Sequence, residues 1–342
     1  MPRSGRRRAR AESWPCHRRA GIVIFGICAA VVGLSPVTIR GEGQGLSDRD
    51  LAAPVSTVVP LWPQDDLAAV TREIIVLDSP DDPNAIKRLV LRPSLVLYRP
   101  APGQSNHRAV LVIPGGAYRR LYLTRGGYDF ADFLVAHGYT VGLLRYRMAR
   151  PAETGAGKPL PLIDAERGLR LLRSRAAELG CDPQRIGLVG SSAGGHLAGS
   201  CAAFGDDGNP QAADSVERVS SRPYFLVLHS PLISMDAAVI NPTMRADFLG
   251  KAPSAALVRQ YSLEEQVGPR WPPTLLVSTR DDRLYPNTAR LVPALQRAGR
   301  PADTLIFERG GHTPGLFELP VPLREWPRQW LEWMDARYSS PR

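Results

Sequence analysis

The fold is decided by the stretch Arg185–Val189 (RIGLV) and the Gly190-Ser191-Ser192-Ala193-Gly194 that follows it. Small residues typical of a helix continue the stretch as far as Phe204. An apolar strand pattern runs directly into a G-x-S-x-G motif, which is the context that a nucleophile elbow requires. A sharp strand-to-helix turn would expose Ser192 at the carboxyl end of the strand, with a helix N-terminus behind it. We therefore expect Ser192 to be a nucleophile; the alternative is a tight turn that is merely rich in small residues.

Apolar strands alternate with amphipathic helices on both sides of this motif. The strands are continuous apolar runs, which indicates a sheet that is covered on both faces. The predicted strands are 109–113, 140–144, 185–189, 224–228, 273–278 and 303–307. The predicted helices are 128–137, 162–179, 194–204, 286–298 and 323–338. Strand–helix repetition at this spacing predicts an α/β-hydrolase fold with a mostly parallel, doubly wound sheet.

Three segments depart from this rhythm. The β-rich runs 73–78 and 88–98, the second interrupted by Pro93, are typical of opening antiparallel strands. The stretch 231–270 is too long for a simple crossover and contains its own helical pieces, so we expect a small cap insertion near the site. The single catalytic domain is expected to span residues 60–342.

The N-terminus carries most of the basic excess. Residues 1–20 contain seven arginines and one acid, so they hold +6 of the net charge of +10 and leave +4 for the rest. This distribution argues against a nucleic-acid partner. The fifteen residues Ala20–Leu34 are uncharged, which matches the apolar core of a signal peptide and falls short of the ~20 residues of a comfortable membrane span.

Export to the periplasm or beyond the cell is therefore expected. Arg18-Arg19 directly before the apolar run resembles a twin-arginine signal. No clean small-x-small cleavage site is present, so residues 1–41 are either an export signal or an uncleaved anchor. Such an anchor would be the only expected contact of the protein with a membrane. Residues 42–59, within a stretch rich in Gly, Ser, Pro and Asp, are expected to form a linker.

Cysteine usage gives little support for a metal site. Cys16 and Cys28 lie in the export segment, which leaves Cys181 and Cys201 for a mature protein. These two could form one disulfide in an oxidising compartment or remain as buried thiols. No CxxC or Cys/His spacing suggests metal ligands, and no cofactor is expected.

A serine nucleophile needs a base and an acid, which in this fold follow it in the order Ser, Asp or Glu, His. His312 lies in Gly-Gly-His directly after the last predicted strand and is the expected base. His196 lies one turn into the helix after Ser192 and is expected to be structural, whereas His229 could line the site.

The acid is expected after the next-to-last strand. Asp281 and Asp282 stand side by side there, in PTLLVSTRDDRLYP, and neighbouring side chains tend to point in different directions. Asp282 is favoured by its spacing from the following helix, and Asp281 is then a solvent-facing or loop-capping carboxylate.

The oxyanion of a tetrahedral intermediate needs fixed N–H donors. One is expected from Ala193, the residue after the nucleophile. The others are expected from Gly116 and Ala117, because the paired glycines after the strand 109–113 let the backbone bend inward with its amides free. Trp62 and Tyr118 are the aromatic residues favoured for a sugar-facing surface, whereas Trp326, Trp330 and Trp333 are expected to be core packing.

Three stretches together resemble the secreted bacterial α/β-hydrolases of the acetylxylan-esterase, or BD-FAE-like, group. They are PGGAYRRLYLTRGGYDFADFLVAHGYTVGLLRYRM, RSRAAELGCDPQRIGLVGSSAGGHLAG and GGHTPGL. The resemblance runs from about residue 58 to the C-terminus and supports Ser192, Asp282, His312 and the PGGAY loop. It implies a small-molecule or polysaccharide ester, commonly acetyl on plant polysaccharide, and no cofactor. The chain departs from the group in the PGGAY loop, the acid loop and Thr313-Pro314, which leaves the substrate open.

The leading hypothesis is a serine carboxylic-ester hydrolase that removes small acyl groups, of which acetyl is favoured, from carbohydrate through an acyl-enzyme on Ser192. One alternative is a serine peptidase of the prolyl-oligopeptidase kind, which shares the fold and the triad order but usually carries a large propeller before the hydrolase domain. A second alternative is a non-catalytic carbohydrate-binding protein that has kept the fold.

Overall fold

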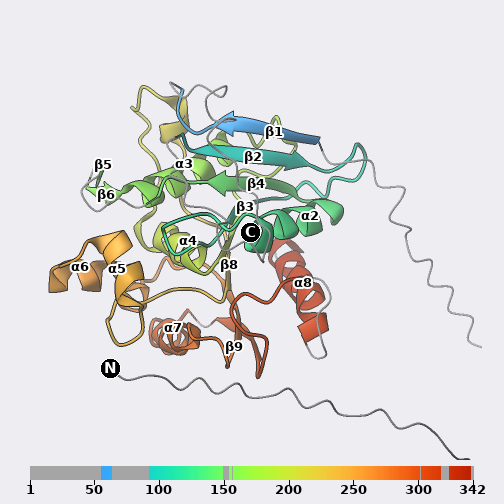
Figure 1. The fold of residues 1–342 in the computed structure, drawn as a ribbon. Helices are drawn as coiled ribbons and strands as arrows, with labels where there is room; N and C mark the ends of the chain where they lie inside the picture. The colour runs from blue at the N-terminus through green and yellow to red at the C-terminus, as the bar shows by residue number, and fades with distance from the viewer. Residues whose placement is uncertain are drawn as a thin grey trace, which may run out of the picture. The chain divides into compact units, whose positions relative to one another are not determined.

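A computed structural model describes residues 55–63, 92–148, 154–155, 157–300, 302–316 and 323–339 (Figure 1). The predicted export segment 1–41, with Cys16 and Cys28, lies outside the described residues. So does the predicted strand 73–78, together with all of the predicted linker before Val55. Among the described residues, no helix is long and apolar enough to cross a membrane.

An eight-stranded sheet forms the centre of the fold, in the order β1-β2-β4-β3-β7-β8-β9-β10. The strands are β1 (Val55–Pro60), β2 (Ser94–Arg99), β3 (Ala109–Ile113), β4 (Thr140–Arg145), β7 (Ile186–Ser191), β8 (Leu226–His229), β9 (Thr274–Thr279) and β10 (Asp303–Phe307). All pairs from β4 to β10 are parallel, and β2 is antiparallel to both β1 and β4. A separate hairpin pairs β5 (Thr154–Gly155) with β6 (Lys158–Pro159). The predicted mostly parallel sheet is confirmed.

Strand β1 was not predicted. The expected linker 42–59 is wrong over residues 55–59, because Val55–Pro60 pairs with Ser94–Arg99 at the sheet edge. The segment VSTVVP is rich in β-branched residues, which favour strands. Its neighbours are rich in Gly, Pro and Asp, and they obscured this short signal. As an edge strand, β1 can end in a proline without losing a ladder hydrogen bond.

Helices cover both faces of the sheet, as predicted. They are α2 (Asp129–Ala136), α3 (Leu160–Ser174), α4 (Ala193–Phe204), α7 (Tyr285–Arg297) and α8 (Trp326–Ser339). In Figure 1, α2 and α8 lie to one side of the strands, whereas α3 and α4 lie to the other. Phe133 of α2 stacks on Trp330 of α8, with 5.4 Å between ring centroids. Trp326 and Trp330 are fully buried and Trp333 packs half-buried against the core, so the tryptophan stripe is core packing, as expected.

The cap insertion follows β8. It contains α5 (Pro242–Leu249), α6 (Ala255–Tyr261) and the short 3₁₀ turn Leu263–Glu265 before the chain enters β9. Asn241 caps α5 by accepting a hydrogen bond from the Thr243 amide. Phe248 then stacks on Tyr118 at 4.4 Å between centroids, which joins the cap to the loop after β3.

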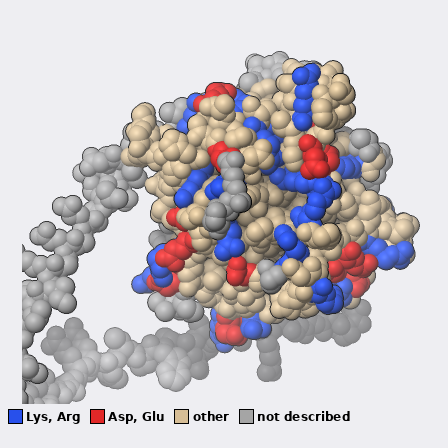
Figure 2. Space-filling model, turned by 180° about the vertical axis from the view of Figure 1, so that it is seen from behind, with Lys and Arg blue, Asp and Glu red and all other residues tan. Residues whose placement is uncertain are grey.

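Cys181 and Cys201 are free and buried, so the structure has the two-thiol arrangement and not the disulfide. Burial raises the pKa of both thiols, which makes them poor nucleophiles. On the face drawn in Figure 2, basic and acidic side chains lie close to one another. Exposed side chains of opposite charge also form ion pairs elsewhere in the described residues, as Arg280 does with Glu308 at 2.9 Å. Exposed pairs of this kind contribute little to stability.

Candidate active site

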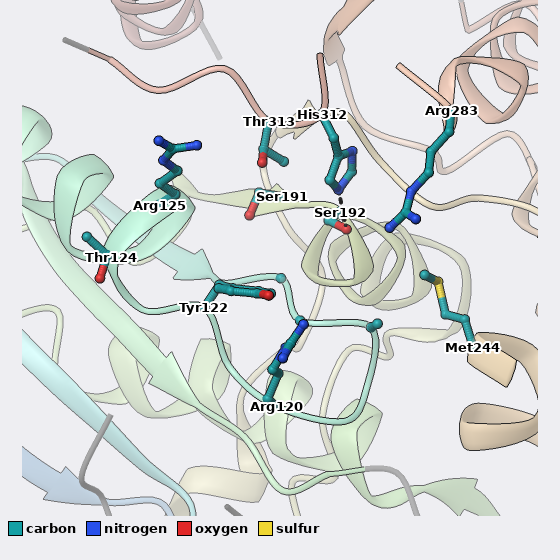
Figure 3. A pocket seen from close by; sticks show the side chains of 13 residues that line it. Arg120, Tyr122, Thr124, Arg125, Ser191, Ser192, Met244, Arg283, His312 and Thr313 are labelled. Carbon is teal, nitrogen blue, oxygen red and sulfur yellow. Dashed lines mark hydrogen bonds between the residues drawn. The ribbon is translucent and has the colours of Figure 1, made fainter. Parts of the chain in front are cut away.

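Ser192 occupies a strained turn between β7 and α4. Its φ of 53° and ψ of −120° lie in a region that residues with a side chain rarely adopt. The turn is tight enough that a Cβ on Gly194 would overlap the carbonyl oxygen of Ile113, and one on Gly190 would overlap the carbonyl of Gly194. The small residues of G-x-S-x-G are therefore required sterically, and they place the Ser192 hydroxyl at the carboxyl end of the sheet (Figure 3).

The structure brings Ser192, His312 and Asp282 into one chain of hydrogen bonds. The Ser192 Oγ lies 2.9 Å from His312 Nε2, and His312 Nδ1 lies 2.9 Å from Asp282 Oδ2. With a proton on Nδ1, the imidazole donates to the carboxylate, and its Nε2 accepts from the serine hydroxyl. This geometry allows His312 to take the proton of Ser192.

The structure also separates the two neighbouring aspartates. The Asp282 side chain has no solvent exposure, and its Oδ1 accepts the Leu284 amide at 2.9 Å. Asp281 is exposed and accepts the amides of Gly310 at 3.2 Å and Gly311 at 2.9 Å. Asp281 therefore caps the loop that carries His312, whereas Asp282 contacts the imidazole itself.

Charge on Asp282 is favoured by its surroundings. Burial raises the pKa of this carboxyl, but hydrogen bonds from His312 and the Leu284 amide outweigh burial and bring the pKa below its ordinary value. An ionised Asp282 can stabilise the imidazolium that forms when His312 accepts a proton.

Two further side chains, which sequence reasoning missed, hold the histidine loop. The Thr279 hydroxyl donates to the carbonyl of Gly311 at 2.7 Å, and the Ser230 hydroxyl accepts the Thr313 amide at 3.1 Å. Thr279 is the last residue of β9, and Ser230 directly follows β8. No local motif marks them, because their role depends on long-range contact.

Two carbonyls of the loop after β3 accept hydrogen bonds from backbone amides of the same loop. Gly116 accepts from the Arg119 amide at 3.1 Å and the Arg120 amide at 3.2 Å, and Gly115 accepts from Tyr122 at 2.9 Å. Gly116 has φ 135°, and a Cβ there would overlap the carbonyl of Arg120. This arrangement places Gly116 and Ala117 at the cavity wall with Ser192, where their amides could meet an oxyanion.

A cavity of about 320 Å³ opens over Ser192 and His312. Its wall includes Tyr122, Arg120 and Arg283, which sequence reasoning did not single out (Figure 3). Tyr122 is the large hydrophobic residue with notable exposure among the described residues, at 39%. Met244 of α5 also lines the cavity, so the cap contributes to the site, as expected.

The two aromatic residues proposed for a sugar-facing surface are placed elsewhere, and that prediction is wrong. Tyr118 is 1% exposed, and its hydroxyl lies 2.6 Å from His196 Nδ1. Trp62 donates to Asp164 at 3.2 Å and lies 4.8 Å below the Arg167 guanidinium, outside the cavity wall. Tyr122 takes the exposed position instead. The positive φ of 62° at Tyr118 turns that side chain inward, which a sequence pattern does not reveal.

The other two histidines near the site are structural. His196 Nε2 lies 2.8 Å from the Tyr261 carbonyl, and burial lowers its pKa to about 4. His229 is buried and stacks on Trp326 at 4.8 Å between centroids. Burial, with a smaller effect of His312, lowers the pKa of His229 to about 3, so the ring is neutral. The His229 carbonyl accepts the Ser192 amide at 3.0 Å and supports the turn that carries Ser192.

The chain is similar to one protein family model and to proteins named as an acetylxylan esterase and a xylanase. The sequence model of the BD-FAE family matches residues 95–290, which is more than half of the chain. The acetylxylan esterase of Xylanibacter ruminicola is 31% identical over 217 residues, covering 62% of this chain and 42% of that protein. Endo-1,4-beta-xylanase B of Butyrivibrio fibrisolvens is 30% identical over 211 residues, covering 59% of this chain and 32% of that protein. This chain thus spans less than half the length of either relative.

Solved structures share the fold. The crystal structure of an acetyl ester-xyloside bifunctional hydrolase from Caldicellulosiruptor lactoaceticus matches with a TM-score of 0.69 and 31% identity, over 82% of this chain and 96% of that one. A thermophilic esterase from Thermogutta terrifontis matches with a TM-score of 0.59 at 20% identity, which is a likeness of fold alone.

Proposed function

The chain belongs to the BD-FAE family, and on that premise we propose that it is a serine carboxylic-ester hydrolase that removes acetyl groups from carbohydrate. The observation that carries the proposal is the hydrogen-bonded chain Ser192–His312–Asp282 at the floor of a cavity. The relatives support the substrate class, because two of them are named for acetyl ester hydrolysis.

In the acylation step, His312 Nε2 takes the proton of Ser192 as Oγ attacks the ester carbonyl carbon. Asp282 holds the imidazole through Nδ1 and stabilises its positive charge. The amides of Gly116, Ala117 and Ala193 bind the oxyanion, and the N-terminus of α4 adds a favourable dipole. His312 then gives its proton to the leaving sugar oxygen, and the ester C–O bond breaks.

Deacylation uses the same groups in reverse. Water loses a proton to His312 and attacks the acetyl carbonyl, and the tetrahedral intermediate collapses with return of the proton to Ser192 Oγ. Acetate leaves and the enzyme is restored. Each step uses only the protein and water.

We further propose that the protein is exported, with residues 1–41 as the signal or anchor. The arginine-rich start and the apolar run Ala20–Leu34 support this. A polysaccharide substrate outside the cell fits the same assignment.

The acyl preference gives the first test of the proposal. The cavity must hold both acyl group and sugar, and Met244 of the cap borders it. A long chain would force the cap to shift, at a cost that corresponds to about 10- to 100-fold in kcat/KM. We therefore expect p-nitrophenyl acetate to be hydrolysed faster than p-nitrophenyl octanoate by that factor, with acetate also released from acetylated xylan.

The Ser192→Ala variant, assayed in the same way, gives the background rate of hydrolysis for both esters. Faster hydrolysis of the octanoate would overturn the small-acyl assignment. A folded protein that hydrolyses neither ester would overturn the esterase assignment itself.

A further inference from the structure

The cavity wall is positively charged. Arg120, Arg125 and Arg283 all line it, and none of the described residues that line it is acidic. A cavity lined by one sign of charge attracts ligands of the other sign. The buried Asp282 lies behind His312 and hydrogen-bonds to it, so its carboxylate is paired with the imidazole and does not line the cavity.

Two of these arginines face the nucleophile. Figure 3 shows Arg283 extending from beside His312 toward Ser192, and Arg120 rising from the opposite side of the opening. Among the described residues, neither guanidinium forms an ion pair. The preceding residue Arg119 differs, because it pairs with Asp247 of α5. Within the part of the chain that the structure describes, no carboxylate therefore competes with a ligand for these two guanidinium groups.

Arg120 is held in place by contacts within the loop after β3. Its amide donates to the Gly116 carbonyl at 3.2 Å, which fixes the start of the side chain. Its guanidinium lies 4.6 Å from the ring centroid of Tyr122, a cation–π contact that orients the planar group. The amide of Tyr122 is itself tied to Gly115 at 2.9 Å. A preorganised guanidinium loses less entropy when it binds a carboxylate.

The position of Arg283 indicates which part of the substrate carries the charge. His312 must lie next to the leaving sugar oxygen, because it protonates that atom. Arg283 lies beside His312, directly after Asp282 in the chain, and so on the leaving-group side of Ser192 (Figure 3). A charged group recognised there belongs to the saccharide and not to the acyl chain.

We propose that this site selects acetyl esters of saccharides that carry a carboxylate, such as a uronic acid, with Arg283 binding that carboxylate and Arg120 adding positive charge from the opposite side of the opening. Guanidinium groups match carboxylates in shape and can bind them through two parallel hydrogen bonds. The inference rests on the proposed esterase function and adds the substrate class to it. Arg125 adds positive charge at the same opening.

The test uses a matched pair of substrates: a mono-acetylated methyl glucuronoside and the methyl glucoside acetylated at the same position. They differ only in a carboxylate replaced by CH₂OH. Because hydrogen bonds to charged groups are strong, we expect kcat/KM for acetate release to favour the glucuronoside by about tenfold or more. Raising the salt concentration is expected to reduce this preference.

Substitutions then assign the preference to the two arginines. In the full chain, Arg120→Gln with Arg283→Gln is expected to bring the glucuronoside-to-glucoside ratio close to one. Arg297→Gln removes the same charge from the exposed end of α7, away from the cavity, and is expected to leave the ratio as in the unaltered chain. Loss of the preference in Arg297→Gln as well would show that only net charge matters and would overturn the inference.

Other outcomes separate the inference from the function on which it rests. Equal hydrolysis of both glycosides by the unaltered chain would overturn the inference and leave the esterase intact. No acetate from either glycoside, together with no turnover of p-nitrophenyl acetate, would overturn the function itself. Faster hydrolysis of p-nitrophenyl hemisuccinate than of p-nitrophenyl butyrate would place the carboxylate on the acyl chain, against the assignment to the saccharide.

Discussion

Replacing Ser192 with alanine is expected to lower kcat for p-nitrophenyl acetate on the order of 10⁶-fold. The proposed reaction passes through an ester of Ser192 Oγ, and alanine offers no atom that can form it. His312 and the oxyanion amides would remain in place, so a small residual rate above that in water is expected. Initial rates of p-nitrophenol release at saturating ester measure the effect.

The control for this variant is Ser200→Ala, the same substitution two turns further along α4. The Ser200 hydroxyl donates to the His196 carbonyl at 2.8 Å and is buried away from the cavity. Its removal is expected to leave kcat within about twofold, because hydrogen bonds of this kind chiefly affect stability. Retention of more than about one hundredth of kcat in Ser192→Ala would contradict a role for Ser192 as nucleophile.

Asp282→Asn is expected to lower kcat about 10⁴-fold. The buried carboxylate accepts the Nδ1 proton of His312, whereas an amide can present its NH₂ group and favour the wrong tautomer. The amide also removes the negative charge that stabilises the imidazolium. The volume is unchanged, so circular dichroism is expected to show the same fold.

Asp281→Asn is the matched control for the neighbouring position. Asp281 accepts the amides of Gly310 and Gly311, and an asparagine oxygen can accept them too. We expect a loss of less than about tenfold, since the substitution only converts two charge-assisted hydrogen bonds into neutral ones. The reverse order of effects would make Asp281 the acid of the triad.

The turn that carries Ser192 was predictable because its information is local. The G-x-S-x-G motif after an apolar strand predicted a tight strand-to-helix turn at Ser192, and the structure shows the backbone strain that the motif requires. The continuous apolar runs likewise predicted the parallel sheet, because strands buried on both faces need no alternation. The antiparallel edge strand β1 has only six residues, and its Gly- and Pro-rich surroundings hid it.

The remainder of the site depends on contacts that sequence does not reveal. Asp281 and Asp282 are adjacent in sequence, and only the position of the histidine loop distinguishes their roles. Asp281 caps that loop, whereas Asp282 is the partner of His312. Tyr118 and Tyr122 lie four residues apart in one loop, and left-handed backbone conformations decide which faces the cavity. Arg283 follows Asp282 and would be interpreted as an ordinary surface charge without the cavity beside it.

The most direct test of the account is covalent labelling with diethyl p-nitrophenyl phosphate. The reagent phosphorylates an activated serine and releases one p-nitrophenol for each site. We expect one equivalent of p-nitrophenol, complete loss of esterase activity, and a diethylphosphoryl group that mass spectrometry locates on Ser192. The Ser192→Ala variant is expected to take up no label. A label on a different residue, or full esterase activity with no label, would contradict the proposal that Ser192 carries the acyl group.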